Sequence, residues 1–339
     1  MVRVLSFWAE IGRNGRPLAA KLVAMERPSD NKPSNAAVAE FLGRYHGRPV
    51  DGLESLGGGF WSAAYGYRVG LDELVLRIGD TPDGFLADQR AMAWGSEALP
   101  VPDLIDVGQA LGRWFAVSRR HHGRFLEEVA ASEAAVLGPT VVGLLAALRG
   151  VRRDQAEQTQ PAKTTLWHDW LDSGLADRPG SHTAGWRDKL LAKPAATDAL
   201  VEAERRIASL LEACPDRGQL VHSDLLHYNV LVADGADAVT AVFSWKCSTW
   251  GDSAYDLAWC TFWGRWHEGI GALDLWDRVV PSLGPLEAAD IEARHHAYEL
   301  HIGASHLGWF ATLGDDEMLA WTTAQLDEIL ERGPLRVRP

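Results

Sequence analysis

The segment "VHSDLLHYNVLV", Val221 to Val232, joins a polar loop to an apolar run that is typical of a β-strand. Its polar half places Asp224 five positions before Asn229, and His222 two positions before Asp224. A carboxylate and a carboxamide at the start of a strand are groups that accept protons or bind hard metal ions. The pattern therefore predicts a functional loop that His222 supports from within.

Phosphoryl transfer from a nucleoside triphosphate is the chemistry that this loop suits best. The reaction needs a carboxylate near the acceptor hydroxyl, oxygen ligands for Mg²⁺ and donors to the phosphates, and it needs little covalent work from the protein. We therefore interpret Asp224 as a catalytic base and Asn229 as a metal ligand. A hydrolase is not supported, because the chain has no G-x-S-x-G motif and "HSD" is not a nucleophile elbow.

The region before the loop predicts a small α+β lobe over residues 35–120. Strand patterns occur in "LESLGGGFWSAAYGYRVG", "DELVLRIG", "LPVPDLIDVGQ" and "GRWFAVSRR". We expect a largely antiparallel sheet, with a tight turn at Gly57, Gly58 and Gly59. The segments "NAAVAEFLGRY", with Asn35 as its N-cap, and "DGFLADQRAMAWGSEA" have a helical period.

After His122 the pattern becomes mainly helical. Short strand patterns appear only around the polar loop, in "LVHSD", "NVLVAD" and "AVTAVFSW". We therefore predict a helical lobe over residues 121–334 that carries the polar loop within hairpin strands. Residues 1–34, which include the polar cluster "MERPSDNKPS", are expected to be an N-terminal extension.

Together these motifs resemble the aminoglycoside phosphotransferase family, and within it the hygromycin B phosphotransferases. The resemblance runs from about Asn35 to Arg332 and rests on "LPVPDLIDVG", "FAVSRRHHG", "LVHSDLLHYNVLV", "VTAVFSW" and "GDSAYDLA". It implies an α+β, bilobal, protein-kinase-like fold with a small antiparallel-sheet lobe and a large helical lobe. It also implies ATP or GTP bound between the lobes, Mg²⁺ as cofactor, and transfer to a hydroxyl of a small molecule.

The resemblance implies a phosphate-binding loop in the small lobe. Gly57, Gly58 and Gly59 would let the backbone approach the phosphates closely, and backbone amides or Ser62 could donate hydrogen bonds to them. A hairpin turn is the simpler explanation of the same glycines.

Further nucleotide contacts are implied on the strands and helix that follow. Arg77 stands where kinases usually carry a lysine on the third strand, and Asp88 in the next helix would be its ion-pair partner. Val117 and Ser118 belong to the segment 116–120, the implied hinge whose backbone faces the adenine.

One position departs from the family pattern. The family has a metal-binding aspartate in the segment after the catalytic loop, and this chain reads "VTAVFSWKCSTWGD" there, with Ser244 at that position. A hydroxyl is a neutral and weaker Mg²⁺ ligand than a carboxylate. We therefore expect a phosphotransferase whose metal site, Asn229 and Ser244, is altered. The alternative is a degenerate, pseudokinase-like protein that binds a nucleotide or small molecule without efficient transfer.

Two other readings of Ser244 remain open. The fold is reused for a metal-independent reaction or the serine is an introduced change, or else Asp252 or Asp256 compensates for it. We do not favour compensation, because Asp252 is expected to cap the following helix and tie it to the catalytic loop. Asp256 is expected one turn into that helix.

The bulk composition narrows the partners. The net charge of −13 argues against nucleic acid or an anionic membrane, and it suits a cationic small molecule as well as simple solubility. No apolar run is expected to span a membrane, and three cysteines without C-x-x-C spacing suit a reducing cytoplasm. We expect a cytoplasmic monomer or weak dimer. The fifteen tryptophans fill a helical core or wall an acceptor pocket.

Overall fold

The structure is a computed structural model that describes residues 32–58, 61–153 and 166–338. Residues 1–31, most of the predicted N-terminal extension, lie outside the described part. The chain divides into two compact units. The first comprises Met1–Gly95, Val101–His122 and Phe243–Lys246, and the second comprises Ser96–Pro100, Gly123–Val242 and Cys247–Pro339. The first is built around a sheet and the second around helices, which is the predicted α+β class.

The first unit contains a five-stranded antiparallel sheet in the order β1-β2-β3-β5-β4. Its strands are β1 (Asp51–Gly58), β2 (Ser62–Val69), β3 (Asp72–Gly79), β4 (Leu104–Ala110) and β5 (Arg113–Arg119). The helices of this unit are α2 (Asn35–His46) and α3 (Asp83–Ala91). Consecutive strands form hairpins except where α3 separates β3 from β4, and this places β5 beside β3.

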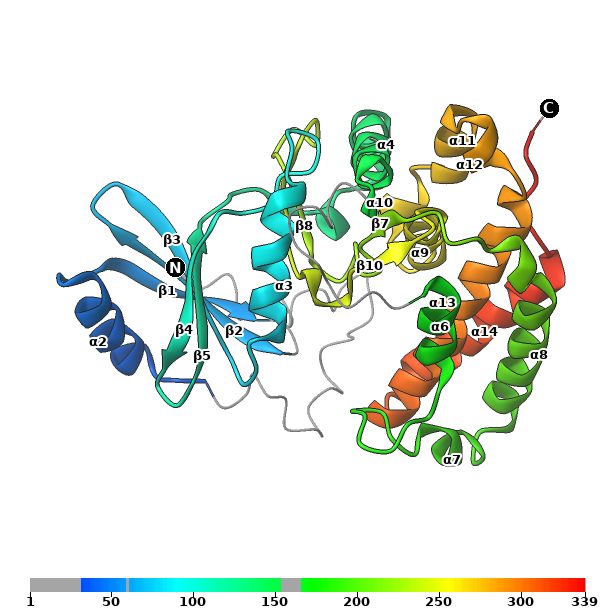
Figure 1. Cartoon of the computed structure of the whole chain (residues 1–339), viewed down its shortest axis with the longest axis horizontal. Coiled ribbons are helices and arrows are strands. Elements are labelled where there is room, and N and C mark those ends of the chain that lie inside the picture. Colours follow the sequence, from blue (N-terminus) through cyan, green and yellow to red (C-terminus); the bar gives the residue numbers. More distant parts are fainter. Residues whose placement is uncertain (1–31, 59–60, 154–165, 339) are drawn as a thin grey trace. The chain divides into compact units, whose positions relative to one another are not determined.

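The two faces of the sheet are covered by different helices, as Figure 1 shows for α2 and α3. Side chains alternate between faces along a strand. On β5, Phe115 and Val117 pack with Val38 and Leu42 of α2. Between them, Ala116 packs with Phe85 of α3. The sheet is therefore buried on both sides, which explains the nearly continuous apolar character of β5.

Two local predictions in this unit are wrong. Gly57 and Gly58 do not form a turn: they end β1 and pair with Ala64 and Ala63 of β2. Gly59 lies outside the described residues. The N-cap of α2 is Ser34 and not Asn35, because the Ser34 side chain accepts a hydrogen bond from the backbone N–H of Ala37.

The second unit is organised around the long helix α13, which packs against α6, α7, α8, α9 and α14. Its helices are α4 (Ala134–Gly150), α6 (Trp167–Leu175), α7 (Trp186–Leu190), α8 (Pro194–Leu210), α9 (Ala254–Gly264), α10 (Glu268–Gly271), α11 (Leu275–Val279), α12 (Pro285–Ala288), α13 (Ile291–Leu313) and α14 (Asp316–Arg332). Many polar side chains of α13 are buried, because helices surround it on several sides.

Two small sheets flank the polar loop. β7 (Gln219–Val221) pairs with β10 (Thr249–Gly251), and β8 (Val230–Val232) lies between β6 (Arg124–Phe125) and β9 (Val239–Val242). The polar loop connects β7 to β8, so its two ends are held by different sheets. Only β8 and β9 form the predicted hairpin.

The helix α4 is more apolar than the sequence analysis allowed. The stretch Ala131–Gly150 is long and apolar enough to cross a membrane by length and composition, with a mean hydropathy of 1.6. The prediction that no run meets this criterion is therefore wrong. Within its unit, α4 buries Leu137, Val141 and Leu144 and packs against β7 and α11. A core helix meets the same criterion.

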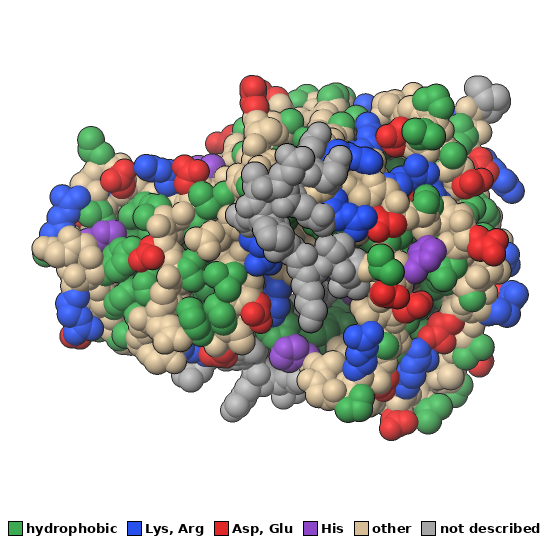
Figure 2. Space-filling view, in the orientation of Figure 1, with side chains coloured by type: hydrophobic (Ala, Val, Ile, Leu, Met, Phe, Trp, Pro, Cys, Tyr) green, Lys and Arg blue, Asp and Glu red, His purple; other side chains and the backbone are tan. Residues whose placement is uncertain are grey.

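Charged side chains are mixed on the surface shown in Figure 2. Lysine and arginine side chains lie among aspartate and glutamate side chains on this face. The net charge of −13 is therefore not gathered into one acidic patch on the face shown.

Candidate active site

The polar loop has an unusual backbone. Ser223, His227 and Tyr228 all have positive φ angles, of 60°, 68° and 65°. Such angles are uncommon for residues other than glycine and are kept where the surrounding structure over-determines them. His222 supplies part of this support. It is fully buried, and its Nδ1 accepts the backbone N–H of Asp224 at 3.2 Å, as the predicted support from within requires.

Asp256 holds the start of the loop. Its two carboxylate oxygens accept the backbone N–H groups of His222, at 2.9 Å, and of Ser223, at 2.8 Å. Burial raises the pKa of Asp256 to about 7, although the two hydrogen bonds act in the opposite direction. The helix is therefore tied to the catalytic loop by Asp256. The expectation that Asp252 makes this tie is wrong.

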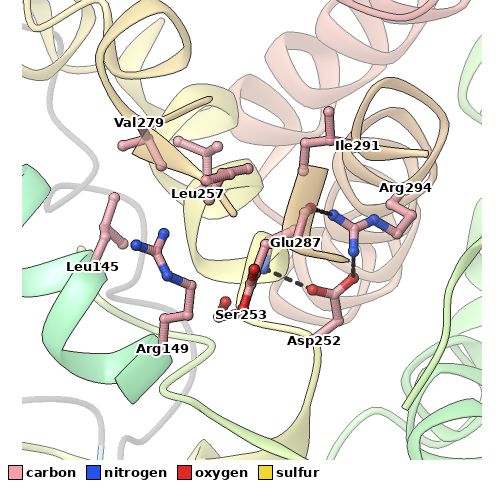
Figure 3. Close-up of a pocket in the computed structure, with 11 residues that line it drawn as sticks. Leu145, Arg149, Asp252, Ser253, Leu257, Val279, Glu287, Ile291 and Arg294 are labelled. Atoms are coloured by element: carbon pink, nitrogen blue, oxygen red, sulfur yellow. Dashed lines mark hydrogen bonds and ion pairs between the residues drawn. The ribbon is translucent and has the colours of Figure 1, made fainter. Parts of the chain in front are cut away.

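Asp252 instead joins three elements behind the loop. Its carboxylate accepts the Ala254 backbone N–H, at 3.2 Å, and the Tyr298 hydroxyl, at 2.9 Å, and it pairs with Arg294 Nη1 at 3.2 Å. Figure 3 shows Asp252 between the start of α9 and Arg294 of α13, beside a cavity of about 20 Å³. That volume is close to what one water needs. Neither Asp224 nor Asn229 lines this cavity.

The structure brings Asp224 and Asn229 together. Asn229 Nδ2 lies 3.0 Å from Asp224 Oδ2, 2.7 Å from the Asp224 backbone oxygen and 3.0 Å from the Leu226 backbone oxygen. These three acceptors occupy the nitrogen end of the carboxamide. The oxygen end, Oδ1, is the atom that remains for a cation, as expected of a neutral hard ligand.

Glu127 supports the other end of the loop. It lies in the 3₁₀ turn Leu126–Glu128 and accepts the backbone N–H of Tyr228 at 2.6 Å. Its second oxygen is buried and has no hydrogen bond among the described residues. Burial raises the pKa of Glu127 to about 7, against the effect of the Tyr228 hydrogen bond. Sequence reasoning missed this residue, because it lies about one hundred positions before the loop.

His227 is a second residue that sequence reasoning missed. Its Nδ1 lies 2.8 Å from Asp224 Oδ1, and its ring packs edge-on against Trp259 and Trp263. Burial lowers the pKa of His227, but the hydrogen bond and charge of Asp224 and the charge of Glu127 outweigh this, so the pKa is raised. The signal in the sequence was a histidine three positions after the candidate base.

In the first unit, Arg77 and Asp88 form the predicted ion pair, with Arg77 Nη2 2.5 Å from Asp88 Oδ2. The other oxygen of Asp88 accepts the backbone N–H of Trp245 at 2.9 Å. The Arg77 guanidinium also lies over the Phe85 ring, 5.3 Å from its centre. Asp88 therefore links β3 to the segment that carries Ser244.

The remaining predicted residues of the first unit lie on strands. Gly57, with a φ of 89°, ends β1, and Ser62 begins β2. Val117 and Ser118 are buried on β5, opposite Leu76 and Val75 of β3. Along this strand the backbone is already paired with β3 and β4, so only its end offers free backbone groups for a nucleotide.

The predicted metal ligands are both neutral. Asn229 belongs to the second unit, and Ser244, with a φ of 70°, belongs to the first. Among the described residues, no group of three or more His, Cys, Asp or Glu side chains could hold a metal ion. Mg²⁺ is usually held by one or two carboxylates together with substrate phosphates. The residues present do not form such a site by themselves, and we derive no step through a metal ion.

Most tryptophans named by the sequence contribute to packing in the second unit. Trp263 and Trp276 are buried, and Trp263 stacks on Trp321 with ring centres 5.5 Å apart. Trp259 and Trp263 also border His227, so these two rings stand beside the candidate base.

Comparison with known proteins gives one consistent answer. The chain matches the description "Phosphotransferase enzyme family" over residues 52–286. A curated relative, hygromycin-B 4-O-kinase of Escherichia coli, is 27% identical over 292 residues, which cover 84% of this chain and 82% of the relative.

Solved structures agree with this match. Aminoglycoside phosphotransferase APH(4)-Ia gives a TM-score of 0.75 at 26% identity, over 88% of this chain and 99% of that one. A thermostable mutant of that enzyme, in a ternary complex with AMP-PNP and hygromycin B, gives 0.74 at 26% identity, over 87% and 98%. The GDP complex of wild-type aminoglycoside 2'-phosphotransferase-IIIa shares the fold, with a TM-score of 0.62 at 16% identity, over 89% and 99%.

Proposed function

Because the chain belongs to the phosphotransferase enzyme family, we propose that it transfers the γ-phosphoryl group of ATP or GTP to a hydroxyl of a small molecule. The observation that carries this proposal is the loop geometry. Asp224 and Asn229 lie in hydrogen-bond contact, on a loop whose backbone Asp256 and Glu127 hold at both ends. Pre-organisation of this kind is what phosphoryl transfer requires of a protein.

Asp224 is the proposed catalytic base. It is half-buried and accepts hydrogen bonds on both oxygens, so its carboxylate is oriented before an acceptor arrives. In the proposed reaction it orients the acceptor hydroxyl and receives its proton as the oxygen attacks phosphorus.

The nucleotide contacts are proposed in residues 35–120. Arg77 would pair with a phosphate while Asp88 fixes its guanidinium, and the end of β1 with Ser62 would donate hydrogen bonds to the phosphates. The end of β5, at Val117 and Ser118, would face the base. Relatives support both nucleotides: one structure holds AMP-PNP and another holds GDP.

The acceptor is proposed to be a hygromycin-like antibiotic or a related metabolite, and a cationic one suits the net charge of −13. The relative that carries this is the ternary complex of APH(4)-Ia with hygromycin B. We place the reaction in the cytoplasm, where nucleoside triphosphates are available, with the protein acting as a monomer or weak dimer.

A second function is favoured by one observation, Ser244. A serine in place of the metal-binding aspartate weakens any Mg²⁺ site made with Asn229. When bound, Mg²⁺ would bridge the nucleotide phosphates and neutralise developing charge. A degenerate kinase that binds a nucleotide without efficient transfer would keep Arg77, Asp88 and Asp224 and lose this charge stabilisation.

The experiment that separates these functions compares the parent protein with Ser244→Asp. Phosphoryl transfer is measured by mass spectrometry against Mg²⁺, ATP or GTP, and a panel of acceptors that includes hygromycin B. We expect transfer by the parent, and a kcat for Ser244→Asp that is higher, by about 10- to 100-fold, because a carboxylate binds Mg²⁺ better than a hydroxyl.

The other outcomes have distinct meanings. Transfer by Ser244→Asp alone supports the degenerate kinase. If neither protein transfers phosphate and neither binds a nucleotide in calorimetry, the phosphotransferase proposal is wrong.

A further inference from the structure

The carboxylate of Asp224 is held on both of its oxygens. His227 Nδ1 lies 2.8 Å from Oδ1, and Asn229 Nδ2 lies 3.0 Å from Oδ2. The last torsion of an aspartate side chain has a broad energy profile and does not fix the carboxylate plane by itself. Two donors on two different oxygens fix that plane.

We propose that His227 is a positioning residue for phosphoryl transfer: it donates its Nδ1–H to Asp224 Oδ1 and sets the plane of the carboxylate that receives the acceptor's proton. This inference rests on the proposed function, because it takes Asp224 as the base.

The role of His227 in the transfer step is purely one of orientation. The acceptor oxygen forms a bond to the γ-phosphorus, the bond from that phosphorus to the β–γ bridging oxygen breaks, and the hydroxyl proton passes to Asp224. His227 gains no proton and forms no bond to the substrate. It keeps Asp224 turned toward the incoming hydroxyl.

The imidazole ring is itself held by packing. Trp263 meets it with ring centres 4.9 Å apart at 72°, and Trp259 with centres 5.5 Å apart at 82°. Edge-to-face contacts of this kind are favourable and directional. The direction of the Nδ1–H bond is therefore set before any substrate binds.

The backbone adds a second constraint on the ring. His227 and Tyr228 are consecutive residues in the left-handed region, and Glu127 accepts the Tyr228 N–H at 2.6 Å. Each such residue costs about 1 kcal/mol or more, so the surroundings must hold the turn in place. The turn brings the side chain at position 227 back to the carboxylate three positions earlier.

The competing explanation is that the ring of His227 only fills space between the tryptophans. Three substitutions separate the donor from the ring. His227→Asn keeps an N–H donor near the position of Nδ1, and asparagine tolerates a positive φ. His227→Phe keeps an aromatic ring without the donor, and His227→Gly removes both while relieving the backbone.

The kinetic test measures kcat and the acceptor KM for these three variants, using whichever acceptor the parent phosphorylates. His46→Asn in the first unit, where His46 contacts Tyr67, is the matched control. If the donor matters, His227→Phe and His227→Gly lower kcat by on the order of 10- to 100-fold with little change in KM, while His227→Asn stays within about fivefold of the parent. The proposal is overturned if folded His227→Phe keeps the parent kcat, or if His227→Asn falls as far as His227→Phe.

A second test does not depend on turnover. Long-range ¹H–¹⁵N spectra of protein labelled with ¹⁵N-histidine report which ring nitrogen carries the proton, and His227→Asn assigns the signal. At pH 9 we expect the Nδ1–H tautomer for His227, because the hydrogen bond selects the tautomer. We also expect Asp224→Asn to shift the Nδ1 signal. An Nε2–H tautomer, or a signal insensitive to Asp224→Asn, overturns the positioning role even if the protein transfers phosphate. The expected spectra without any transfer would overturn the proposed function instead.

Discussion

At the scale of single residues, two acids in the motif "GDSAYD" exchange the roles that the sequence suggested. Asp252 precedes the first residue of α9 and Asp256 lies within its first turn. Only Asp256 reaches the backbone N–H groups of His222 and Ser223, whereas Asp252 meets Tyr298 and Arg294 of α13. The difference depends on where the helix begins and which way its first turn faces. Neither is fixed by spacing alone.

The residues of the catalytic loop were predictable to different degrees. Asp224, Asn229 and His222 follow from a spaced pattern, and the ion pair of Arg77 with Asp88 follows from a strand and the next helix. His227 was in view but had no role, because only the left-handed turn at positions 227 and 228 brings it to Asp224. Glu127 could not be found, because nothing in the sequence links it to the loop.

At the scale of elements, strands were easier to predict than the connections between them. The alternation of apolar residues located β2, β3, β4 and β5. The glycines at the end of β1 were wrongly placed in a turn, because a strand that accepts glycine has no pattern that separates it from a turn. The pairing of β7 with β10 was also missed, because the partners lie almost thirty residues apart and each has only three residues.

The contact of β10 with α6 yields a prediction at this scale. A Cβ atom added to Gly251 would lie 2.0 Å from Cε3 of Trp167, a buried ring stacked on Trp170. Gly251→Ala should therefore lower the free energy of unfolding by about 1–3 kcal/mol or more, because an overpacked core must shift backbone or ring. Urea denaturation followed by tryptophan fluorescence measures this change.

Gly143→Ala is the matched control for that substitution. Gly143 lies within α4, and its added Cβ would meet no atom within 4 Å. The same chemical change should there stabilise the protein by roughly 0.5–1 kcal/mol through helix propensity. Equal effects of the two substitutions would contradict the packing described for Gly251.

At the scale of the whole molecule, buried histidines dominate the expected response to acid. Burial lowers the pKa values of His267, His296 and His301 to about 4 and that of His306 to about 3. The unfolded chain binds protons at these residues near pH 6.5 and the folded protein does not, so stability falls as the pH falls from about 6.5 toward 4.

Two buried carboxyls oppose this trend. The pKa values of Glu127 and Asp256 are raised to about 7, so the folded protein holds their protons where the unfolded chain has lost them. Their contribution falls as the pH rises from about 4 to 7. The histidines outnumber them, so the net expectation is a loss of stability on acidification below about pH 6.5.

His301 provides the test of this pH dependence. It is 2% exposed, and its ring contacts the Tyr255 hydroxyl and the Leu171 backbone oxygen. In His301→Gln the loss of unfolding free energy between pH 7 and pH 5 should be smaller by about 2 kcal/mol, because one titrating group is removed. Denaturation series at the two pH values measure it. An unchanged difference would mean that His301 does not contribute to acid sensitivity.

The most direct test of the whole account is acceptor-dependent phosphoryl transfer by the parent and by Asp224→Asn, with nucleotide affinity measured in parallel. Asp198→Asn, at an exposed position of α8, serves as the control. If Asp224 is the base, its substitution lowers kcat by about 10²- to 10⁴-fold while the nucleotide Kd stays the same. Transfer that continues undiminished in Asp224→Asn, or a parent that binds nucleotide and phosphorylates no acceptor, would contradict the account.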